Sequence, residues 1–530
     1  MLRQTRWWPA ALILLVAISA LSWQWLREEA TRQNRVMGSM AVVAIAAILL
    51  LLWLLLLSRL PVRSRLVICG SVLLLAAAAA FLVEIRGVTG DLVPVVGWRW
   101  GSGPSFGEIS GQEVRDGVNQ GDDFPQFLGP KRNATVPSAN LSRDWRALPP
   151  EELWRRPVGA GWSGFAVVGG RAVTQEQRGD QEAVVAYELL SGEPLWTYLY
   201  DAAFETAIGG SGPRATPTIS RGRVFTMGST GILHSLDLAT GELLWSHDLV
   251  AEFGAQIPEW GKSASPLVIT GQESTEQGSI EQRSTEQVIV TSTGRSVEGE
   301  MAGGKGGDKA LMAFDAASGD LLWSAGDERP GYSSPLQATL AGIEQIVVFN
   351  EASVTGHTLA DGSQLWRYPW SNSQPNVSQP LPLSADQLLV SSGYGIGAAL
   401  LHLSADGSGG LEAEPLWQSP RLKLKFSQAV FHQGFLYGLD DGVLTCVDPS
   451  SGERRWKKGR YGHGQILLVG DLLLLQSEKG KLVLIDPNPD ELTELASLEV
   501  LDGRAWNTMA VAGNYLLMRN DREAVCFELR

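Results

Sequence analysis

The side chains best suited to chemistry in this sequence are arginines, lysines and aromatic rings that recur at one position of a repeated pattern. Guanidinium and ammonium groups bind carboxylates and sulfates, and aromatic rings stack on sugars, so this mixture indicates an anionic or sugar ligand, or a peptide strand. The competing interpretation is that these side chains fill a central channel and satisfy loop carbonyls. The nine candidates are Arg214, Trp260, Lys262, Tyr332, Asn376, Tyr394, Lys425, Arg504 and Trp506.

Cysteine and histidine spacing predicts neither a metal site nor a disulfide framework. The three cysteines, Cys69, Cys446 and Cys526, lie far apart, and the 6 histidines form no pair with metal-ligand spacing. The glycine-rich stretch 393–397 lies between two expected strands rather than before a helix, so it does not predict a phosphate-binding loop. The sequence therefore assigns no catalytic residue and no metal ligand.

A repeated motif must position the candidate residues. An apolar strand ends in Asp, a Gly follows four residues later, and a Trp follows four residues after the Gly. The Asp side chain can accept bonds from backbone N–H groups of the turn, and Gly can adopt a positive φ there. We expect the Trp to pack as a wedge between neighbouring units. The clearest copies are Asp237, Gly241 and Trp245; Asp315, Gly319 and Trp323; and Asp448, Gly452 and Trp456.

The spacing of the repeat predicts an all-β, eight-bladed propeller over residues 122–530. Each unit of about 40–45 residues contains two hairpins, which is the size of one blade. A degenerate unit at Leu495 brings the count to eight, and seven blades remain if that unit is incomplete. The Trp positions that mark the other units are Trp154, Trp196, Trp245, Trp323, Trp366, Trp417 and Trp456.

Two irregular segments fit this propeller. The strand expected at 152–158 has no partner before it, and 505–530 contains three strands without a fourth, so we expect these pieces to pair and close the ring. The segment 271–309 contains a direct duplication and a glycine-rich run, which predicts a low-complexity insertion with a strand at 288–291.

The first 86 residues predict a membrane region. Three apolar runs near 7–26, 36–57 and 66–85 are each long enough to cross a hydrocarbon core of about 30 Å. A competing interpretation makes the first run a cleaved signal peptide, but it lacks a good small-residue cleavage site. Residues 87–121 are expected to be a linker.

Charge in the flanks of these runs predicts their orientation. Arg3 and Arg6, with three arginines in the loop 58–65, slightly outnumber the basic residues on the other side. This favours a multi-pass membrane protein with the propeller on the non-cytoplasmic side. The net charge of -14 argues against a nucleic-acid partner.

The repeat resembles the pyrroloquinoline-quinone (PQQ) repeat of quinoprotein-type and BamB-like bacterial propellers. The stretch 123–133 (DFPQFLGPKRN) resembles the lead-in of these proteins, and so do 212–217 (GPRATP) and 260–266 (WGKSASP). The resemblance covers about residues 122–530 and implies the fold more strongly than the function.

The resemblance implies two functions. The first is a membrane-anchored scaffold that binds envelope proteins or a small ligand in the central funnel and needs no cofactor. The alternative is a PQQ- and Ca²⁺-dependent membrane dehydrogenase of sugars or alcohols. The quinoprotein alcohol dehydrogenases use a vicinal cysteine pair, which this sequence lacks, so a binding role is the first expectation.

Overall fold

The computed structural model describes residues 6–27, 31–100, 122–137, 141–270, 286–292, 310–370, 373–407 and 409–530. The chain divides into two compact units. The first contains Met1–Gly103 and Ala207–Gly210, and the second contains Pro104–Thr206 and Ser211–Arg530. The predicted combination of an eight-bladed propeller and three apolar N-terminal helices is confirmed.

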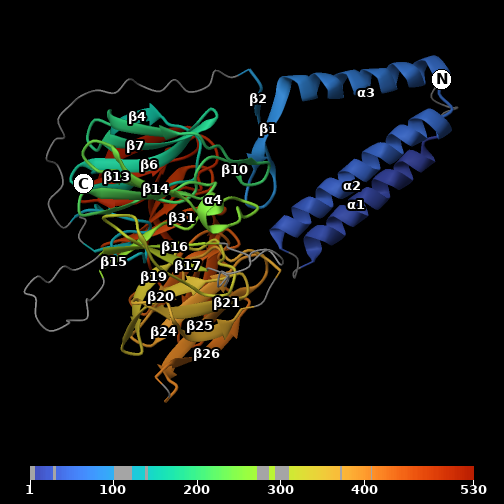
Figure 1. Ribbon diagram of the computed structural model, residues 1–530. Helices are drawn as coiled ribbons and strands as arrows, with labels where there is room; N and C mark the ends of the chain where they lie inside the picture. The colour runs from blue at the N-terminus through green and yellow to red at the C-terminus, as the bar shows by residue number, and fades with distance from the viewer. Residues whose placement is uncertain are drawn as a thin grey trace, which may run out of the picture. The chain divides into compact units, whose positions relative to one another are not determined.

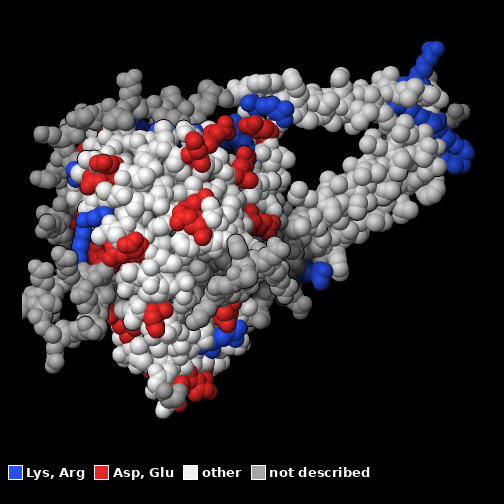
Figure 2. All heavy atoms as spheres, viewed as in Figure 1, with Lys and Arg blue, Asp and Glu red and all other residues white. Residues whose placement is uncertain are grey.

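Three long helices form most of the first unit. They are α1 (Trp8–Leu26), α2 (Arg32–Leu52), which continues into the π-helical turn η2 (Trp53–Leu57), and α3 (Val62–Leu82). By length and apolar composition each can cross a membrane. Figure 2 shows the sides of these helices almost free of charged side chains, with basic residues gathered near their ends.

A hairpin follows α3 where the sequence predicted the end of a helix and a linker. The helix ends at Leu82, and β1 (Val83–Val88) pairs with β2 (Pro94–Trp98). Val83, Ile85 and Val88 in β1 and Val95 and Val96 in β2 are β-branched, and Leu92 adopts a positive φ in the turn between the strands, so this stretch favours a hairpin over continuation of the helix. Of the predicted linker 87–121, positions 101–121 lie outside the described residues.

The second unit is a ring of eight antiparallel blades of four strands each, one of which gains β3 as a fifth, parallel strand (Figure 1). The first strands of neighbouring blades contact one another around the axis. From the innermost strand outward, blade 1 is β5 (Ala166–Val168), β6 (Arg171–Arg178), β7 (Gln181–Glu188) and β8 (Pro194–Tyr200); blade 2 is β11 (Thr218–Ser220), β12 (Arg223–Met227), β13 (Ile232–Asp237) and β14 (Leu243–Asp248); blade 3 is β15 (Leu267–Thr270), β16 (Glu286–Thr291), β17 (Leu311–Asp315) and β18 (Leu321–Ala325); and blade 4 is β19 (Leu336–Leu340), β20 (Ile343–Phe349), β21 (Ser353–Thr358) and β22 (Gln364–Pro369).

The second half of the ring follows the same order. Blade 5 is β23 (Leu381–Pro382), β24 (Gln387–Ser392), β25 (Gly397–Ala405) and β26 (Leu411–Ser419); blade 6 is β27 (Ala429–His432), β28 (Phe435–Asp440), β29 (Val443–Asp448) and β30 (Glu453–Arg460); blade 7 is β31 (Gln465–Val469), β32 (Leu472–Gln476), β33 (Lys481–Asp486) and β34 (Thr493–Glu499); and blade 8 is β35 (Ala510–Ala512), β36 (Tyr515–Arg519), β37 (Glu523–Glu528) and β4 (Glu151–Pro157). Three short elements lie between blade strands in the chain: β9 (Glu205–Thr206), β10 (Gly210–Ser211) and α4 (Leu249–Phe253).

The repeat motif joins each blade to the next. In blade 2, Asp237 accepts bonds from the N–H groups of Ala239 and Thr240, and Gly241 has φ +74°. The indole of Trp196 in blade 1 lies against Gly241, where a Cβ atom would come within 2.6 Å of the ring. Its Nε1–H donates to the carbonyl of Leu238 at 2.9 Å. The Trp of one blade therefore packs on the turn of the following blade.

A β-bulge fixes the position of this Trp. In every blade the ladder between the third and fourth strands shifts by one residue just before the Trp position. In blade 7 the bulge includes Leu495, and Ala496 lies opposite Leu484. Ala496, not Leu495, is thus the counterpart of the Trp. Blade 8 has no turn between its third and fourth strands, since the chain ends after β37, so a Trp at this position would have no turn glycine to pack on.

The ring is closed by the pairing of its two ends. β4 lies antiparallel to β37, with Trp154 opposite Cys526. Behind this pair, the fully buried guanidinium of Arg519 donates to the Oγ1 of Thr174 at 2.7 Å and to the carbonyl of Gly159 at 2.8 Å. Blade 8 is therefore tied to blade 1 by a strand ladder and by buried hydrogen bonds.

Blade 3 takes its second strand from the predicted insertion 271–309. β16 pairs with both β15 and β17, so the strand expected at 288–291 is part of the sheet. Val288, Ile289 and Val290 form a short continuous run of β-branched apolar residues, and all three side chains are buried, as is typical of a strand with both faces covered. Residues 271–285 and 293–309 lie outside the described residues.

The segment before β4 enters the axis of the ring. Phe124 bridges to Val167 in β5, and the carbonyl of Pro125 accepts from the N–H of Ile219 in β11. Further along, β3 (Thr135–Val136) adds to β31 as a parallel strand. Residues 122–136 therefore line the innermost strands of several blades and close the central channel.

Candidate binding funnel at the propeller axis

Eight of the nine predicted site residues lie on the segments that lead into innermost strands. These segments connect the outer strand of one blade to the axis of the next, so their side chains converge above the channel. Tyr394 is the exception, because it lies in the turn between β24 and β25 of blade 5 and has φ +59°. Blade 2 supplies Arg214, blade 3 Trp260 and Lys262, blade 4 Tyr332, blade 5 Asn376, blade 6 Lys425, and blade 8 Arg504 and Trp506.

A guanidinium that lies against two neighbouring indoles forms one side of the funnel. The Arg504 guanidinium carbon lies 4.5 Å from the ring centroid of Trp162 and 4.3 Å from that of Trp506. The Nε1–H of Trp506 donates to Glu478 at 2.9 Å. Burial is the main cause that lowers the pKa of Arg504. The arrangement holds a desolvated cation in a fixed plane, which suits recognition of a carboxylate.

A lysine continues this side of the funnel. The Lys425 ammonium lies 4.5 Å from the ring centroid of Tyr394 and 5.9 Å from that of Phe426. The Phe426 ring in turn lies 4.8 Å from that of Trp506. Blades 5, 6 and 8 thus bring Lys425 and Arg504 into one continuous aromatic cluster.

A second cluster comes from blades 2 to 4. The rings of Trp260 and Tyr332 lie 5.4 Å apart, and the Arg214 guanidinium lies 4.5 Å from the ring of Phe204. Burial lowers the pKa of Arg214 to about 10; Glu182 opposes this, and the positive charge of Arg504 adds to it. The charge of Arg504 therefore acts on Arg214, although the two residues belong to the lead-in segments of different blades.

Lys262 is the most strongly perturbed lysine of the funnel. Its side chain is only 5% exposed, and burial lowers its pKa from 10.5 to about 8. The carbon chain packs on Gly231 of the neighbouring blade, where a Cβ atom would come within 2.9 Å of the Lys262 Cε. The ammonium group is thus held in a site where charge is costly.

Asn376 braces the loops of the funnel. Its side-chain amide donates to the carbonyls of Asn350 at 2.8 Å and Glu351 at 3.1 Å, and its Oδ1 accepts from Ser392 at 2.6 Å. The backbone carbonyl of Asn376 also accepts from the N–H of Tyr332. This residue therefore fixes the relative position of blades 4 and 5 below the aromatic rings.

A ring of hydrogen bonds lies beneath the funnel and passes through all eight blades. Most members are Thr, Ser, Gln or Asn side chains at equivalent positions of the lead-in segments, and four of them precede a proline that leads into an inner strand. The bonds run from Gly164 to Thr216, Thr216 to Ser265, Ser265 to Ser334, Ser334 to Gln379, Gln379 to Gln428, Gln465 to Phe426 and Trp506, and Asn507 to Gly161 and Ser163.

Arg132 fills the axis at the level of this ring. It belongs to the segment that closes the channel, and it is 1% exposed. Its guanidinium donates to backbone carbonyls of blades 3 and 4, among them Pro335 at 3.0 Å, and its Nε donates to Gln126 at 2.7 Å. Burial lowers its pKa to about 9. The axis is therefore blocked below the funnel by a protein side chain.

Sequence reasoning missed Trp162 and Phe426, which complete the aromatic cluster. Both lie on lead-in segments, as most of the predicted residues do. A search of the same position in blades 1 and 6 would therefore have identified them. Glu478 lies instead between β32 and β33, and only the fold brings it to Trp506. No local signal distinguishes it from other exposed-looking loop carboxylates.

A calcium ion would need several carboxylate or amide oxygens around one point. Among the residues that the structure describes, no three His, Cys, Asp or Glu side chains gather in a metal-binding arrangement. Cys446 and Cys526 are buried in different blades. The funnel side chains therefore fit an anion better than the calcium-bound cofactor of the quinoproteins.

Comparison with known proteins decides the family. The family described as outer membrane protein assembly factor BamB matches residues 146–257 and 281–458, which is more than half of the chain. The chain belongs to the BamB family. The match spans the repeats of blades 1 to 6, whose Asp, Gly and Trp residues form the contacts between blades.

Solved structures show the same fold at low sequence identity. BamB from Moraxella catarrhalis is 14% identical with a TM-score of 0.50, and the alignment covers 72% of this BamB-family chain and 98% of that one. A quinohemoprotein alcohol dehydrogenase from Comamonas testosteroni is 12% identical with a TM-score of 0.54, covering 78% and 81%. A europium-containing methanol dehydrogenase is 13% identical with a TM-score of 0.53, covering 75% and 89%. Comparison with curated protein sequences gives no match.

Proposed function

We propose that this BamB-family chain is a membrane-anchored binding scaffold of the bacterial envelope, with its propeller on the periplasmic side and an anionic ligand group in the axial funnel. The family description, outer membrane protein assembly factor, supports a role beside other envelope proteins. The three apolar helices support attachment to the inner membrane. The carboxylate-bearing group belongs either to a small molecule or to a protein partner.

The observation that carries the proposal is the buried guanidinium of Arg504 beside the neighbouring rings of Trp162 and Trp506. Cation–π contacts with the two rings restrict its orientation, and the planar fork of a guanidinium matches the two oxygens of a carboxylate. Lys425, Lys262 and Arg214 add positive charge around the same space. An anion that enters a desolvated site of this kind gains more electrostatic energy than it would in water.

The scaffold proposal invokes no cofactor. The cations and aromatic rings of the funnel support the binding of an anion. Dehydrogenase activity is the opposing outcome of the experiment that follows.

The test measures the melting temperature of the detergent-solubilised full chain with citrate, sulfate and a neutral sugar. A ligand that binds only the native state at 100 times its dissociation constant raises the free energy of unfolding by about 2.7 kcal/mol. We expect a concentration-dependent increase with citrate and none with the sugar. Arg504→Gln should abolish the increase, while Lys458→Gln on an outer strand should retain it.

Two outcomes would contradict the proposal. One is a melting temperature that citrate and sulfate leave unchanged in the wild-type chain. The other is a shift that requires PQQ together with Ca²⁺ and that accompanies dye reduction by sugars or alcohols. That second result would assign the chain to the membrane dehydrogenases.

A further inference from the structure

The outer strand of blade 6 differs in charge from every other outer strand of the propeller. In β30, five of the eight residues are Arg or Lys: Arg454, Arg455, Lys457, Lys458 and Arg460. The other seven outer strands, all of them described, contain three such residues together, Arg155, Arg156 and Arg367. We call the five cations of β30 the basic rim. Figure 2 shows that acidic side chains outnumber basic ones on the visible face of the propeller.

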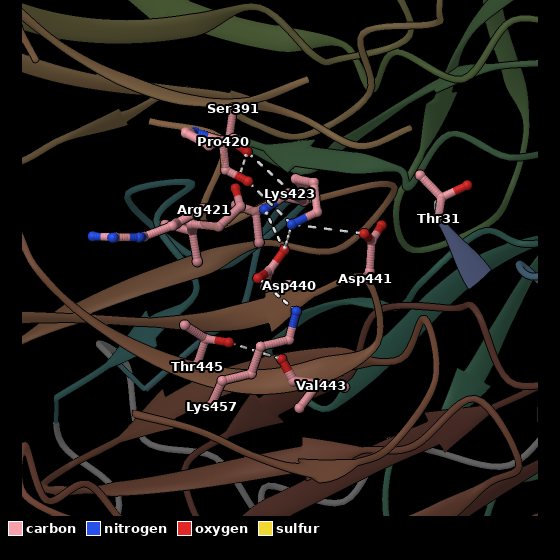
Figure 3. A network of polar contacts seen from close by, with 12 residues as sticks. Thr31, Ser391, Pro420, Arg421, Lys423, Asp440, Asp441, Val443, Thr445 and Lys457 are labelled. Carbon is pink, nitrogen blue, oxygen red and sulfur yellow. Dashed lines mark hydrogen bonds and ion pairs between the residues drawn. The ribbon is translucent and has the colours of Figure 1, made fainter. Parts of the chain in front are cut away.

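A buried carboxylate holds part of the basic rim in place (Figure 3). Asp440 in β28 has a fully buried side chain and contacts the ammonium groups of Lys423 at 2.5 Å and Lys457 at 2.7 Å, as well as Arg454 at 3.0 Å. Burial alone would raise the pKa of Asp440, but the two lysines lower it further than burial raises it. Lys423 also lies 3.7 Å from the Asp441 carboxylate, so three cations surround two neighbouring carboxyl groups and are held in place by them.

The remaining cations of the rim are exposed and lie beside aromatic surface. They are Arg455, which pairs with the exposed Asp490 at 3.1 Å, and Lys458 and Arg460. The Arg455 guanidinium lies 5.9 Å from the ring of Phe435, at the tip of the hairpin that joins β27 to β28. On the same hairpin, Phe431 is 36% exposed, and it is the one exposed Phe, Trp or Tyr among the described residues of the propeller.

Protection of a sheet edge does not explain the basic rim. Lysine on an edge strand discourages pairing with other chains. However, β8, β14, β18, β26 and β34 are outer strands of the same ring, and none of them contains Lys or Arg. The concentration of charge on a single blade instead indicates a partner that this blade alone meets.

We propose that the basic rim of blade 6, with Phe431 and Phe435, docks on the anionic lipid surface of the membrane in which the chain is anchored. Cations attract anionic headgroups, and aromatic rings are favoured at the interface between water and hydrocarbon. The three apolar helices hold a bilayer within reach of the propeller. The acidic charge elsewhere on the propeller is repelled by the same lipids, so docking selects one blade and one orientation.

The experiment measures the distance of two blades from the bilayer in the full chain. Ser451→Cys in the turn of blade 6 and Thr240→Cys at the equivalent turn of blade 2, across the ring, each receive a fluorescent donor. The chain is reconstituted in nanodiscs with acceptor-labelled headgroups, either purely zwitterionic or containing phosphatidylglycerol. Labelling of the buried Cys446 and Cys526 is controlled by the chain without either new cysteine.

We expect energy transfer from position 451 to exceed that from position 240 by about twofold in anionic discs, and the difference to vanish near 1 M salt, where the Debye length falls to about 3 Å. Lys458→Glu with Arg460→Glu should remove the excess without lowering the melting temperature. The matched pair Arg221→Glu and Arg223→Glu on blade 2, with the same change in net charge, should leave it intact.

Equal transfer from the two positions in anionic discs would overturn the proposal, and so would an excess that persists in the Lys458→Glu, Arg460→Glu chain. Binding of soluble polyglutamate to the rim with equal transfer in all discs would identify an acidic polypeptide as the occupant instead. Citrate binding in the funnel is measured on the same variants, and its retention separates this result from failure of the funnel proposal.

Discussion

At the residue scale, the funnel depends on cations that the fold keeps away from water. Lys262 is the clearest case, because burial is the cause of its lowered pKa of about 8. Arg504 and Arg214 also lose hydration, but aromatic faces stack on their guanidinium groups. Desolvation of a cation is costly, and an anion that binds beside it reduces that cost.

Lys262 predicts a pH dependence of stability. The unfolded chain holds its proton up to about pH 10.5, and the folded chain releases it near pH 8, so the free energy of unfolding rises with pH between these values. Lys262→Met should therefore be more stable than the wild type at pH 7, by about 2 kcal/mol. The difference should shrink as the pH rises above 8.

Denaturant unfolding of the two chains at pH 7 and pH 10 measures this effect. Lys458→Met serves as the control, because Lys458 is an exposed residue of β30 and should change stability little at either pH. A Lys262→Met chain that is less stable than the wild type at pH 7 would show that the ammonium makes contacts worth more than its desolvation.

At the element scale, the turn between the third and fourth strands performs two tasks in most blades. It reverses the chain through a residue of positive φ, and it receives the Trp of the preceding blade. Gly192, Gly241, Gly319, Gly362 and Gly452 all place their Cα against such a Trp. The repeat motif therefore forms the contact between neighbouring blades as well as the turn.

Two glycines of blade 2 allow the effect of the turn and the effect of the Trp contact to be measured separately. Gly241 has φ +74° and faces Trp196, whereas Gly222 has φ +76° and nothing within 4 Å of its Cβ position. Gly222→Ala should cost about 1 kcal/mol, the penalty of a left-handed conformation. Gly241→Ala should cost about 1–3 kcal/mol more, because its methyl group overlaps the indole.

Chemical denaturation of the full chain in detergent gives both values. Trp196→Phe, which removes part of the ring, should reduce the cost of Gly241→Ala and leave that of Gly222→Ala unchanged. Equal costs for the two alanine variants would contradict a wedge contact between blades.

At the scale of the whole molecule, one chain joins two parts that suit different surroundings, a set of apolar helices and a propeller. The helices α1, α2 with η2, and α3 are apolar enough for a bilayer. The propeller buries its apolar residues between blades and closes its ring through β4 and β37. An odd number of spans would place the N-terminus and the propeller on opposite sides of the membrane.

The flanking arginines predict which side holds the propeller. With Arg3, Arg6 and the loop 58–65 in the cytoplasm, the C-terminus lies in the periplasm. A C-terminal alkaline phosphatase fusion should therefore be active in cells, and a C-terminal green fluorescent protein fusion exported by the same route should be dark. The reverse pair of results would place the propeller in the cytoplasm.

Local sequence signals were sufficient for the blades and the long helices of this protein, although not for the hairpin of β1 and β2. The spacing from Asp448 to Gly452 to Trp456 specifies a turn, a bulged strand and a blade, because each step depends on neighbouring backbone geometry. The apolar runs likewise specify helices, since length and composition decide whether a bilayer can accept them. Fold and family followed from these short-range patterns.

Contacts between blades could be assigned only from the tertiary structure. The meeting of Arg504 with Trp162 joins residues from opposite ends of the propeller chain, and only ring closure brings them together. The absence of a turn in blade 8 explains Ala496 in blade 7, and the axial position of Arg132 depends on carbonyls from several blades at once. Side chains such as these are placed by the packing of distant segments, on which the local sequence pattern has no influence.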